Sequence, residues 1–191
     1  LNAKAGPLIY TDLELKDLDG KLEVADQIVS LENFEAKGLD GNMAFNGAYD
    51  TQDPAKPAFN LKYDLSQLDF QKTFQAFNTF QSLAPIGKYI EGKFTSTLVM
   101  EGILGQDMMP DLGTLSAQGF LETVNGFVKG YPPLQAIGNK LNTDAFENLD
   151  LQNTRNWFEI KDGSLEVKEF DYEVKDIAMK IGGSHSIARA Q

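Results

Sequence analysis

The sequence predicts an α+β fold that is mostly β: a curled antiparallel sheet with two short helices packed on its apolar face. Most of the chain alternates between apolar and polar residues with a period of two, as half-buried strands do. Short spacing between these segments favours antiparallel hairpins, because parallel neighbours need a crossover of a dozen or more residues. Two segments break the alternation and have the spacing of amphipathic helices.

The alternating segments define the faces that we expect to be apolar. Each run carries its large apolar side chains at every second position. The expected apolar positions are Leu39, Met43, Phe45 and Tyr49; Phe59, Leu61, Tyr63 and Leu65; Phe158 and Ile160; Leu165 and Val167; Phe170, Tyr172 and Val174; and Ile177, Met179 and Ile181.

Glycine pairs punctuate the strands. Asp19-Gly20, Asp40-Gly41 and Asp162-Gly163 are typical of tight turns, whereas Asn46-Gly47 and Asn125-Gly126 fit either turns or bulges within strands. Residues 17–41 and 159–183 resemble each other weakly, which indicates two equivalent hairpins within one domain of residues 1–191.

The first expected helix is rich in phenylalanine. Ser66 stands three residues before Asp69, an approximate capping box, and Pro85 and Gly87 are expected to end the helix. At about 100° per residue, one apolar face then carries four aromatic rings. These are Phe70, Phe74, Phe77 and Phe80.

The second expected helix covers residues 132–142. Pro132 and Pro133 suit the first turn of a helix, where a missing N–H costs nothing. Leu134, Ile137 and Leu141 would form a narrow apolar stripe along it.

Composition excludes several classes of function. The chain has 28 acidic and 17 basic residues, for a net charge of −11, and no basic cluster, so neither nucleic acid nor an anionic membrane surface is an expected partner. It has no cysteine, and no run approaches the roughly 18 apolar residues that a membrane span needs. Because it begins at Leu1, we interpret it as part of a longer protein whose anchor lies outside this sequence.

No motif predicts a catalytic, cofactor or metal site. "GKYIEGK", from Gly87 to Lys93, has the spacing of a phosphate-binding loop, but Phe94 stands where Ser or Thr is needed, and a strand pattern follows. "KDLDGKLEVADQ" has its glycine too early for a calcium loop and favours a hairpin turn. His185, the one histidine, is expected in a polar tail.

The middle of the chain resembles the C-terminal region of the AsmA-like family of bacterial envelope proteins. The residues that carry the likeness are "GLDGNMAFNGAYD", "PAFNLKYDLSQLDFQKTFQAF", the segment from "LAPIGKYIEGK" to "QGFLETVNG", and "FEIKDGSLEV". The likeness extends over roughly residues 8 to 183 and is best from 38 to 141. It rests on glycine and hydrophobic spacing, with no catalytic signature.

The resemblance implies a non-enzymatic periplasmic module. Members of the family are anchored in the inner membrane by an N-terminal segment, take part in outer-membrane assembly, and in larger relatives are thought to carry phospholipid along a hydrophobic groove. The family has no localised active site, so no functional residues are carried over individually. The expected partners are a phospholipid or other acyl chain and envelope proteins.

Two further hypotheses remain beside this one. A structural or protein-interaction module of the envelope would have a closed core, no ligand and a sheet edge that pairs with partners. A hydrolase would need two carboxylates facing each other in a cleft, one with a raised pKa.

The phenylalanine stripe itself allows two interpretations. Buried against the sheet, its four rings would contribute at most about 6–12 kcal/mol to stability, and aromatic stripes at helical spacing are usually core. Alternatively, part of the stripe lines a groove for an acyl chain. The candidate lipid-facing residues on that second interpretation are Phe70, Phe74, Phe77, Phe80, Phe45, Phe59 and Tyr63.

Overall fold

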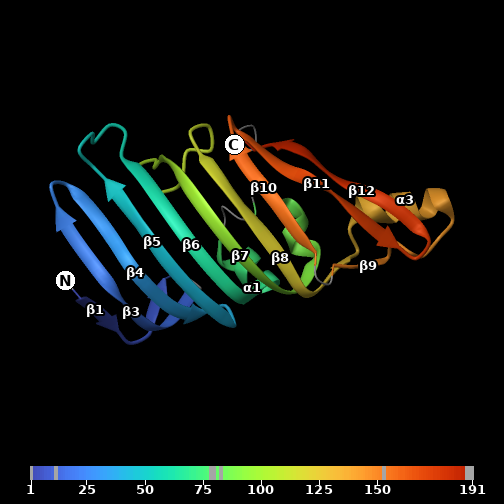
Figure 1. Ribbon diagram of the computed structural model, residues 1–191, viewed down its shortest axis with the longest axis horizontal. Coiled ribbons are helices and arrows are strands. Elements are labelled where there is room, and N and C mark those ends of the chain that lie inside the picture. Colours follow the sequence, from blue (N-terminus) through green and yellow to red (C-terminus); the bar gives the residue numbers. More distant parts are fainter. Residues whose placement is uncertain (1, 11–12, 78–80, 82–83, 152–153, 188–191) are drawn as a thin grey trace.

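The structure is a computed structural model that describes residues 2–10, 13–77, 81, 84–151 and 154–187. Its described strands form one open antiparallel sheet of twelve strands, and this confirms the predicted fold class. From one edge to the other the order is β1-β3-β4-β5-β6-β7-β8-β10-β11-β12, with β2 paired to β3 and β9 paired to β8 (Figure 1).

Nearly every strand pairs with the next along the chain, so the sheet is built from successive hairpins. The strands are β1 (Asn2–Ala5), β2 (Leu8–Tyr10), β3 (Leu13–Ala25), β4 (Ile28–Gly38), β5 (Gly41–Asp50), β6 (Ala58–Asp69), β7 (Ile90–Ile103), β8 (Ser116–Lys129), β9 (Asn148–Asp150), β10 (Arg155–Lys161), β11 (Ser164–Val174) and β12 (Ile177–Ser186). The described helices are α1 (Phe70–Ala76), the 3-10 turn η1 (Pro85–Tyr89) and α3 (Pro132–Leu141).

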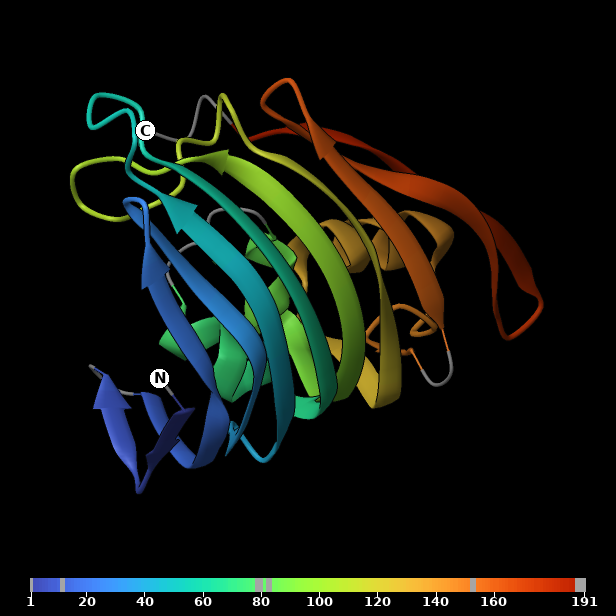
Figure 2. The same ribbon diagram turned by 60° about the vertical axis from the view of Figure 1, so that its left-hand side comes forward.

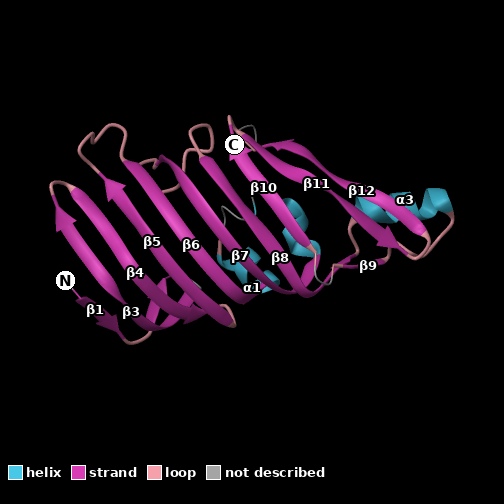
Figure 3. Cartoon of the chain, viewed as in Figure 1, coloured by secondary structure: helices cyan, strands magenta, loops and turns pink. Residues whose placement is uncertain are grey.

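The sheet curls, and the helices lie on the face toward which it curls (Figures 2 and 3). We call this side the inner face and the opposite side the outer face. Every alternating segment predicted from the sequence forms a strand, and its apolar set points to the inner face. Leu39 is the exception, because it lies in the turn between β4 and β5.

Bulges bend the long strands and shift the phase of their alternation. The register slips in β3, in β4 between Leu31 and Phe34, and in β6 between Leu65 and Leu68. A residue with positive φ lies at each of these slips: Asp17, Asn33 and Gln67. One extra residue moves the apolar set from odd to even positions while keeping it on the inner face, and such bulges increase the local twist.

The bulges explain where the turn predictions succeeded and where they were wrong. The turns before Gly41 and at Asp162-Gly163 are confirmed. Asp19-Gly20 is not a turn, because it lies within β3, where Gly20 makes room for a side chain of β4: a Cβ on Gly20 would lie 2.5 Å from Phe34 Cδ2. The segment compared with a calcium loop is therefore mainly this bulged strand and not a hairpin turn.

The two Asn-Gly pairs both lie inside strands. Asn125, with φ of 52°, forms a bulge in β8, whereas Asn46-Gly47 keeps the regular register of β5. Residues 17–41 contain the β3–β4 hairpin, and residues 159–183 contain most of β11–β12. These two hairpins occupy opposite ends of the sheet (Figure 1).

The first helix is shorter than expected and starts later. Strand β6 continues through Ser66 to Asp69, so the expected cap at Ser66 is wrong: the Asp69 carboxylate accepts the hydrogen bond from the Lys72 backbone N–H at 2.8 Å. The bulge at Gln67 allows β6 to continue to Asp69, through residues whose spacing also fits a helix. Helix α1 then ends at Ala76.

Helix α3 confirms the second prediction. Pro132 and Pro133 occupy its first turn, and Asn142 ends it in the left-handed conformation at φ of 53°. Leu134 packs against a buried cluster beneath the helix, whereas Ile137 and Leu141 remain exposed. His185 lies within β12 opposite Leu165, so its expected place in a tail is wrong.

Candidate functional site

On the inner face of β4, β5 and β6 lie apolar side chains that no element of the described residues covers. Because paired residues on neighbouring strands share a face, the register puts Leu31, Gly47 and Leu61 in one row. A second row contains Val29 and Tyr49. We call five half-buried residues of this region the open patch: Val29, Leu31, Phe34, Tyr49 and Leu61.

The open patch is separate from the buried clusters of the described residues. None of its five residues belongs to a buried cluster or packs against one. Gly47 has no side chain in the middle of this row. A Cβ at this position would lie 2.5 Å from the Asn60 carbonyl oxygen, so a larger residue does not fit. The result is an uncharged apolar strip across three strands.

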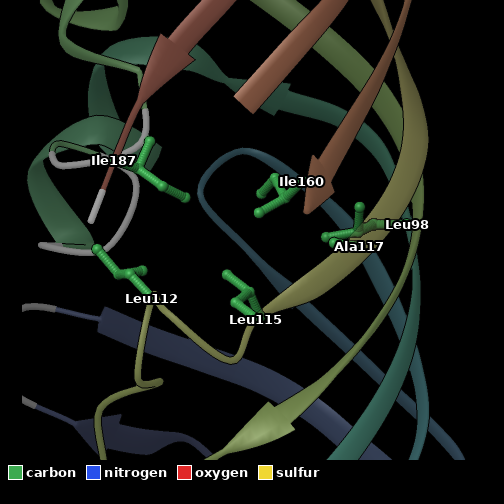
Figure 4. Close-up of a cluster of buried hydrophobic side chains, with 6 residues drawn as sticks. All are labelled: Leu98, Leu112, Leu115, Ala117, Ile160 and Ile187. Carbon is green, nitrogen blue, oxygen red and sulfur yellow. The ribbon is translucent and has the colours of Figure 1, made fainter. Parts of the chain in front are cut away.

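The adjacent inner face of β7, β8 and β10 is covered. Leu98, Ala117 and Ile160 point from these strands toward Leu112 and Leu115, in the connection between β7 and β8, and toward Ile187 beyond β12 (Figure 4). The same connection folds back through hydrogen bonds such as Asp111 N to Ile103 O at 2.9 Å. All six cluster residues are at most 8% exposed.

Two further clusters cover other parts of the inner face. Beneath α1, Phe70 and Phe94 bring their ring centroids to 4.6 Å and pack with Met43 and Leu68. Beneath α3, a second cluster is built around Phe146 and packs against Leu134. In the described residues, α1 packs on β6 and β7.

The structure divides the phenylalanine stripe. Phe70 is 1% exposed and belongs to the core, Phe74 is half-buried, and Phe77 is 39% exposed just after the helix ends. Phe80 lies outside the described residues. Among the three described rings, only that of Phe70 is fully packed, and Phe77 lies after the end of α1.

The three candidate residues on strands form the border of the open patch. Phe45 packs against the cluster beneath α1, and Phe59 and Tyr63 pack against the cluster around Leu98. All three are half-buried on the inner face. They connect the covered region to the open patch, and Phe45 pairs directly with Phe34.

Tyr63 is the side chain at this border whose pKa is shifted by its surroundings. Burial raises the pKa of its hydroxyl to about 12, and a hydrogen bond with the Ser96 side chain partly offsets the rise. The phenol therefore keeps its proton at any physiological pH. The border of the open patch is uncharged as well.

The outer face of the same strands is polar and paired. Thr97 Oγ1 donates to the Asp64 carboxylate at 2.6 Å, and Lys21 lies 3.0 Å from Glu32. The carboxyl pKa values that shift among the described residues, those of Asp17, Glu23, Asp40 and Asp144, are all lowered by a neighbouring lysine. A hydrolase of the kind considered above needs one raised carboxyl pKa.

The sequence did not identify some residues of the open patch and some of those that cover the neighbouring region. Val29 and Leu31 alternate regularly and could have been found, but the bulge at Asn33 hides their relation to Phe34. Leu112, Leu115 and Ile187 cover the sheet from segments without any periodic pattern. No sequence signal marks those three as core.

Within the described residues, no group of three or more His, Cys, Asp or Glu side chains is placed to hold a metal ion, and no helix is long and apolar enough to cross a membrane. The "GKYIEGK" segment forms η1 and the start of β7, so it leads into a strand as expected. Comparison of the chain with protein-family models, curated proteins and solved structures finds no match.

Proposed function

We propose that this protein is a non-enzymatic lipid-binding module that holds an acyl chain on the open patch. The observation that carries the proposal is that Leu31, Leu61 and their neighbours lie half-buried on the inner face of an open, curled sheet, outside the buried clusters. Contiguous apolar surface outside the core is typical of binding sites.

An acyl chain suits this surface better than a polypeptide does. The side chains of the open patch carry no charge, and the neighbouring Tyr63 stays neutral. A polypeptide brings backbone N–H and C=O groups that need hydrogen-bond partners, whereas each buried methylene of an acyl chain contributes about 0.8 kcal/mol without any partner. The curl of the sheet brings several strands around one such chain (Figure 2).

The resemblance to the AsmA-like family gives this activity a setting. In that setting the chain is a periplasmic part of a longer protein, held at the bacterial inner membrane by a segment outside this sequence. Its role is phospholipid transport or homeostasis in outer-membrane assembly. Among the described strands, the edge strands β1 and β12 each pair with one neighbour, which is compatible with a longer groove of the same kind.

Native mass spectrometry of the purified chain, with extraction and identification of lipid from the same sample, tests the proposal. We expect about one phospholipid per chain. Leu61→Asn should lose the lipid, whereas Val99→Asn should keep it, because Val99 is exposed on the outer face of the adjacent strand. Both variants must remain folded by circular dichroism.

A ligand-free mass for wild type would overturn the proposal. It would then favour the alternative function, a structural or protein-interaction module of the envelope. The observation behind that alternative is the edge strand β12, which pairs only with β11 in the described sheet. Such an edge can accept a strand from a partner.

A further inference from the structure

One row of paired residues crosses most of the sheet on its inner face. Each member is the partner of the next across neighbouring strands, so their side chains share that face. None of them carries a polar side chain, and the row runs across the strands instead of along one. From β3 to β11 its members are Leu22, Leu31, Gly47, Leu61, Met100, Ala117, Ile160 and Leu165.

The row changes from open to covered between β6 and β7. From Leu22 to Leu61 its residues are half-buried and belong to none of the buried clusters of the described chain, and we call this part the open half of the row. From Met100 onward its residues belong to the cluster around Leu98 or pack against it. One line of apolar residues is therefore accessible on one half of the sheet and core on the other.

Leu115 closes the open half at β7. The connection between β7 and β8 carries this residue onto the inner face, where it is 3% exposed. A Cβ on Gly102 of β7 would lie 3.4 Å from the Leu115 Cα atom, and Gly102 pairs with Phe59 of β6. We call the side chains of Met100 and Leu115 the end wall, because they stop the open half directly beside β6.

The other end of the open half lies at β3, close to the margin of the sheet. Val24 pairs with Val29 and therefore shares the inner face with the row. It is 67% exposed, whereas the residues of the cluster around Leu98 are at most 8% exposed. A ligand on the open half can thus extend past Val24 into solvent, and it cannot pass the end wall.

The open half has the length of one acyl chain. From β6 through β5 and β4 to β3, the row crosses three strand spacings, or roughly 14 Å. The hydrocarbon of one bilayer leaflet is roughly 15 Å thick, half of the bilayer core. An acyl chain of this length that begins at the end wall therefore ends at β3, where its polar end leaves the sheet.

The charged residues beside the open half are on the outer face. Lys21 precedes Leu22 on β3, and Glu32 follows Leu31 on β4. Because successive residues of a strand point to opposite faces, both charges lie on the far side of the sheet from the row. They also pair with each other, since Lys21 Nζ lies 3.0 Å from a Glu32 carboxylate oxygen. The row therefore presents only apolar groups to a ligand.

A charged pocket of about 620 Å³ near α1 is separate from the row. Its lysines are each within 3.4 Å of a carboxylate, and the lysines are Lys16, Lys37 and Lys72. Ala36 and Met43, between this pocket and the open patch, are only 6% and 4% exposed. A headgroup in that pocket is cut off from the row, so recognition on the row is limited to the acyl chain.

We propose that a lipid lies along the open half in one direction, with the methyl end of one acyl chain against the end wall and its headgroup in solvent beyond Val24. This inference rests on the proposed function and adds the direction of the ligand and the part of it that is recognised. Removal of methylene groups from water supplies the affinity, so lipids with equal chains and different headgroups bind alike.

Paramagnetic NMR of the full chain measures the direction. Two phosphatidylcholines carry a nitroxide on one acyl chain, one near its methyl end and the other near its carboxyl end. Because roughly 14 Å separates the two ends of the open half, we expect the methyl-end probe to broaden the methyl signals of Met100 and Leu61 roughly tenfold more than those of Val24. The carboxyl-end probe should give the reverse order. Each sample is measured again after reduction of the nitroxide.

Matched methionine variants test the end wall. Met100→Ala should weaken the binding of phosphatidylcholine by roughly fourfold or more, the equivalent of one methylene group returned to water. Met100→Leu keeps the apolar contact and should bind like wild type. Met109→Ala, at a 39% exposed position in the connection between β7 and β8, should also bind like wild type. Circular dichroism confirms that all three variants remain folded.

The outcomes separate this inference from the proposed function. Reversed or equal broadening by the two probes, with lipid still retained in native mass spectra, would overturn the direction and leave lipid binding intact. Clearly different affinities for phosphatidylcholine and phosphatidylglycerol with the same chains would overturn recognition by the chain alone. Retained lipid that broadens no methyl signal of the row would place the ligand elsewhere and contradict both proposals. A ligand-free mass would also overturn both, and a ligand-free dimer would assign the open half to a second copy of the chain.

Discussion

The inner face of the sheet has two neighbouring regions with the same sequence pattern and different surroundings. On β7, β8 and β10, Leu98, Ala117 and Ile160 are buried beneath side chains from a connection and from the end of the described chain. On β4, β5 and β6, equally apolar residues such as Leu31 and Leu61 remain half-buried. Alternation thus determines which face is apolar, while separate segments determine whether that face is covered.

The largest expected difference between the regions is in stability. Phe94→Ala, in the cluster beneath α1, should lower the free energy of unfolding by about 3–5 kcal/mol, because it leaves a cavity next to Phe70. Phe34→Ala, in the open patch, should cost less than half as much. Urea unfolding of both variants measures the comparison. Equal losses would mean that the open patch is ordinary core.

Uncovering the covered region is the next test. Leu112→Ala should lower the free energy of unfolding by about 2–5 kcal/mol and increase the fluorescence of a dye that binds exposed apolar surface. Met108→Ala in the same connection, where Met108 is 57% exposed, should change stability by no more than about 0.5 kcal/mol. Unchanged dye binding by Leu112→Ala would contradict the role of Leu112 as a cover.

Tyr63, at the border between the regions, should make the free energy of unfolding depend on pH in the alkaline range. The folded Tyr63 hydroxyl has a pKa of about 12 and the unfolded one a pKa near 10, so the folded state retains the proton between these values. The stability that this proton provides is complete below pH 10 and is lost as the pH rises to 12, by up to about 2–3 kcal/mol.

Tyr63→Phe isolates that contribution. The variant should lose less stability than wild type over pH 10 to 12 in urea titrations at fixed pH, because other groups still titrate in both proteins. A wild-type curve parallel to that of the variant would show that the Tyr63 hydroxyl is as accessible as it is in the unfolded chain.

The smallest expected effect concerns the outer face, where the fluorescence of Trp157 should not change when lipid is added. Trp157, the one tryptophan, is 51% exposed and packs beside Phe120 on the side opposite the open patch. Adding phosphatidylglycerol should leave its emission maximum and its quenching by acrylamide unchanged. A blue shift would place bound lipid on the outer face instead.

The sequence predicts the strands and their faces well because the alternation is local. Phe59, Leu61, Tyr63 and Leu65 share a face in the structure as they do in the pattern. The first helix was harder, since Leu68 and Phe70 fit both a bulged strand end and a helix start, and only tertiary packing decides between them.

The candidate site could be predicted only in part. Phe45, Phe59 and Tyr63 were correctly placed on one face, but the sequence did not separate Phe70, which is core, from Phe77, which is exposed. The grouping of Lys16, Lys37 and Lys72 around one pocket was not predicted, because strand register joins the first two and the packing of α1 adds the third. Covering by Leu112 and Ile187 depends on long-range contacts without a local signature.

The bulged residues Asp17, Asn33 and Gln67 have a consequence for how this architecture tolerates insertion and deletion. In a regular strand, one added or lost residue turns every later side chain to the wrong side. In β3, β4 and β6 a bulge already accommodates one extra residue, so a length change at that point leaves both flanking segments correctly oriented. Insertions and deletions at the bulges can therefore change the length of a strand and the curvature of the sheet while the other strands keep their pairing.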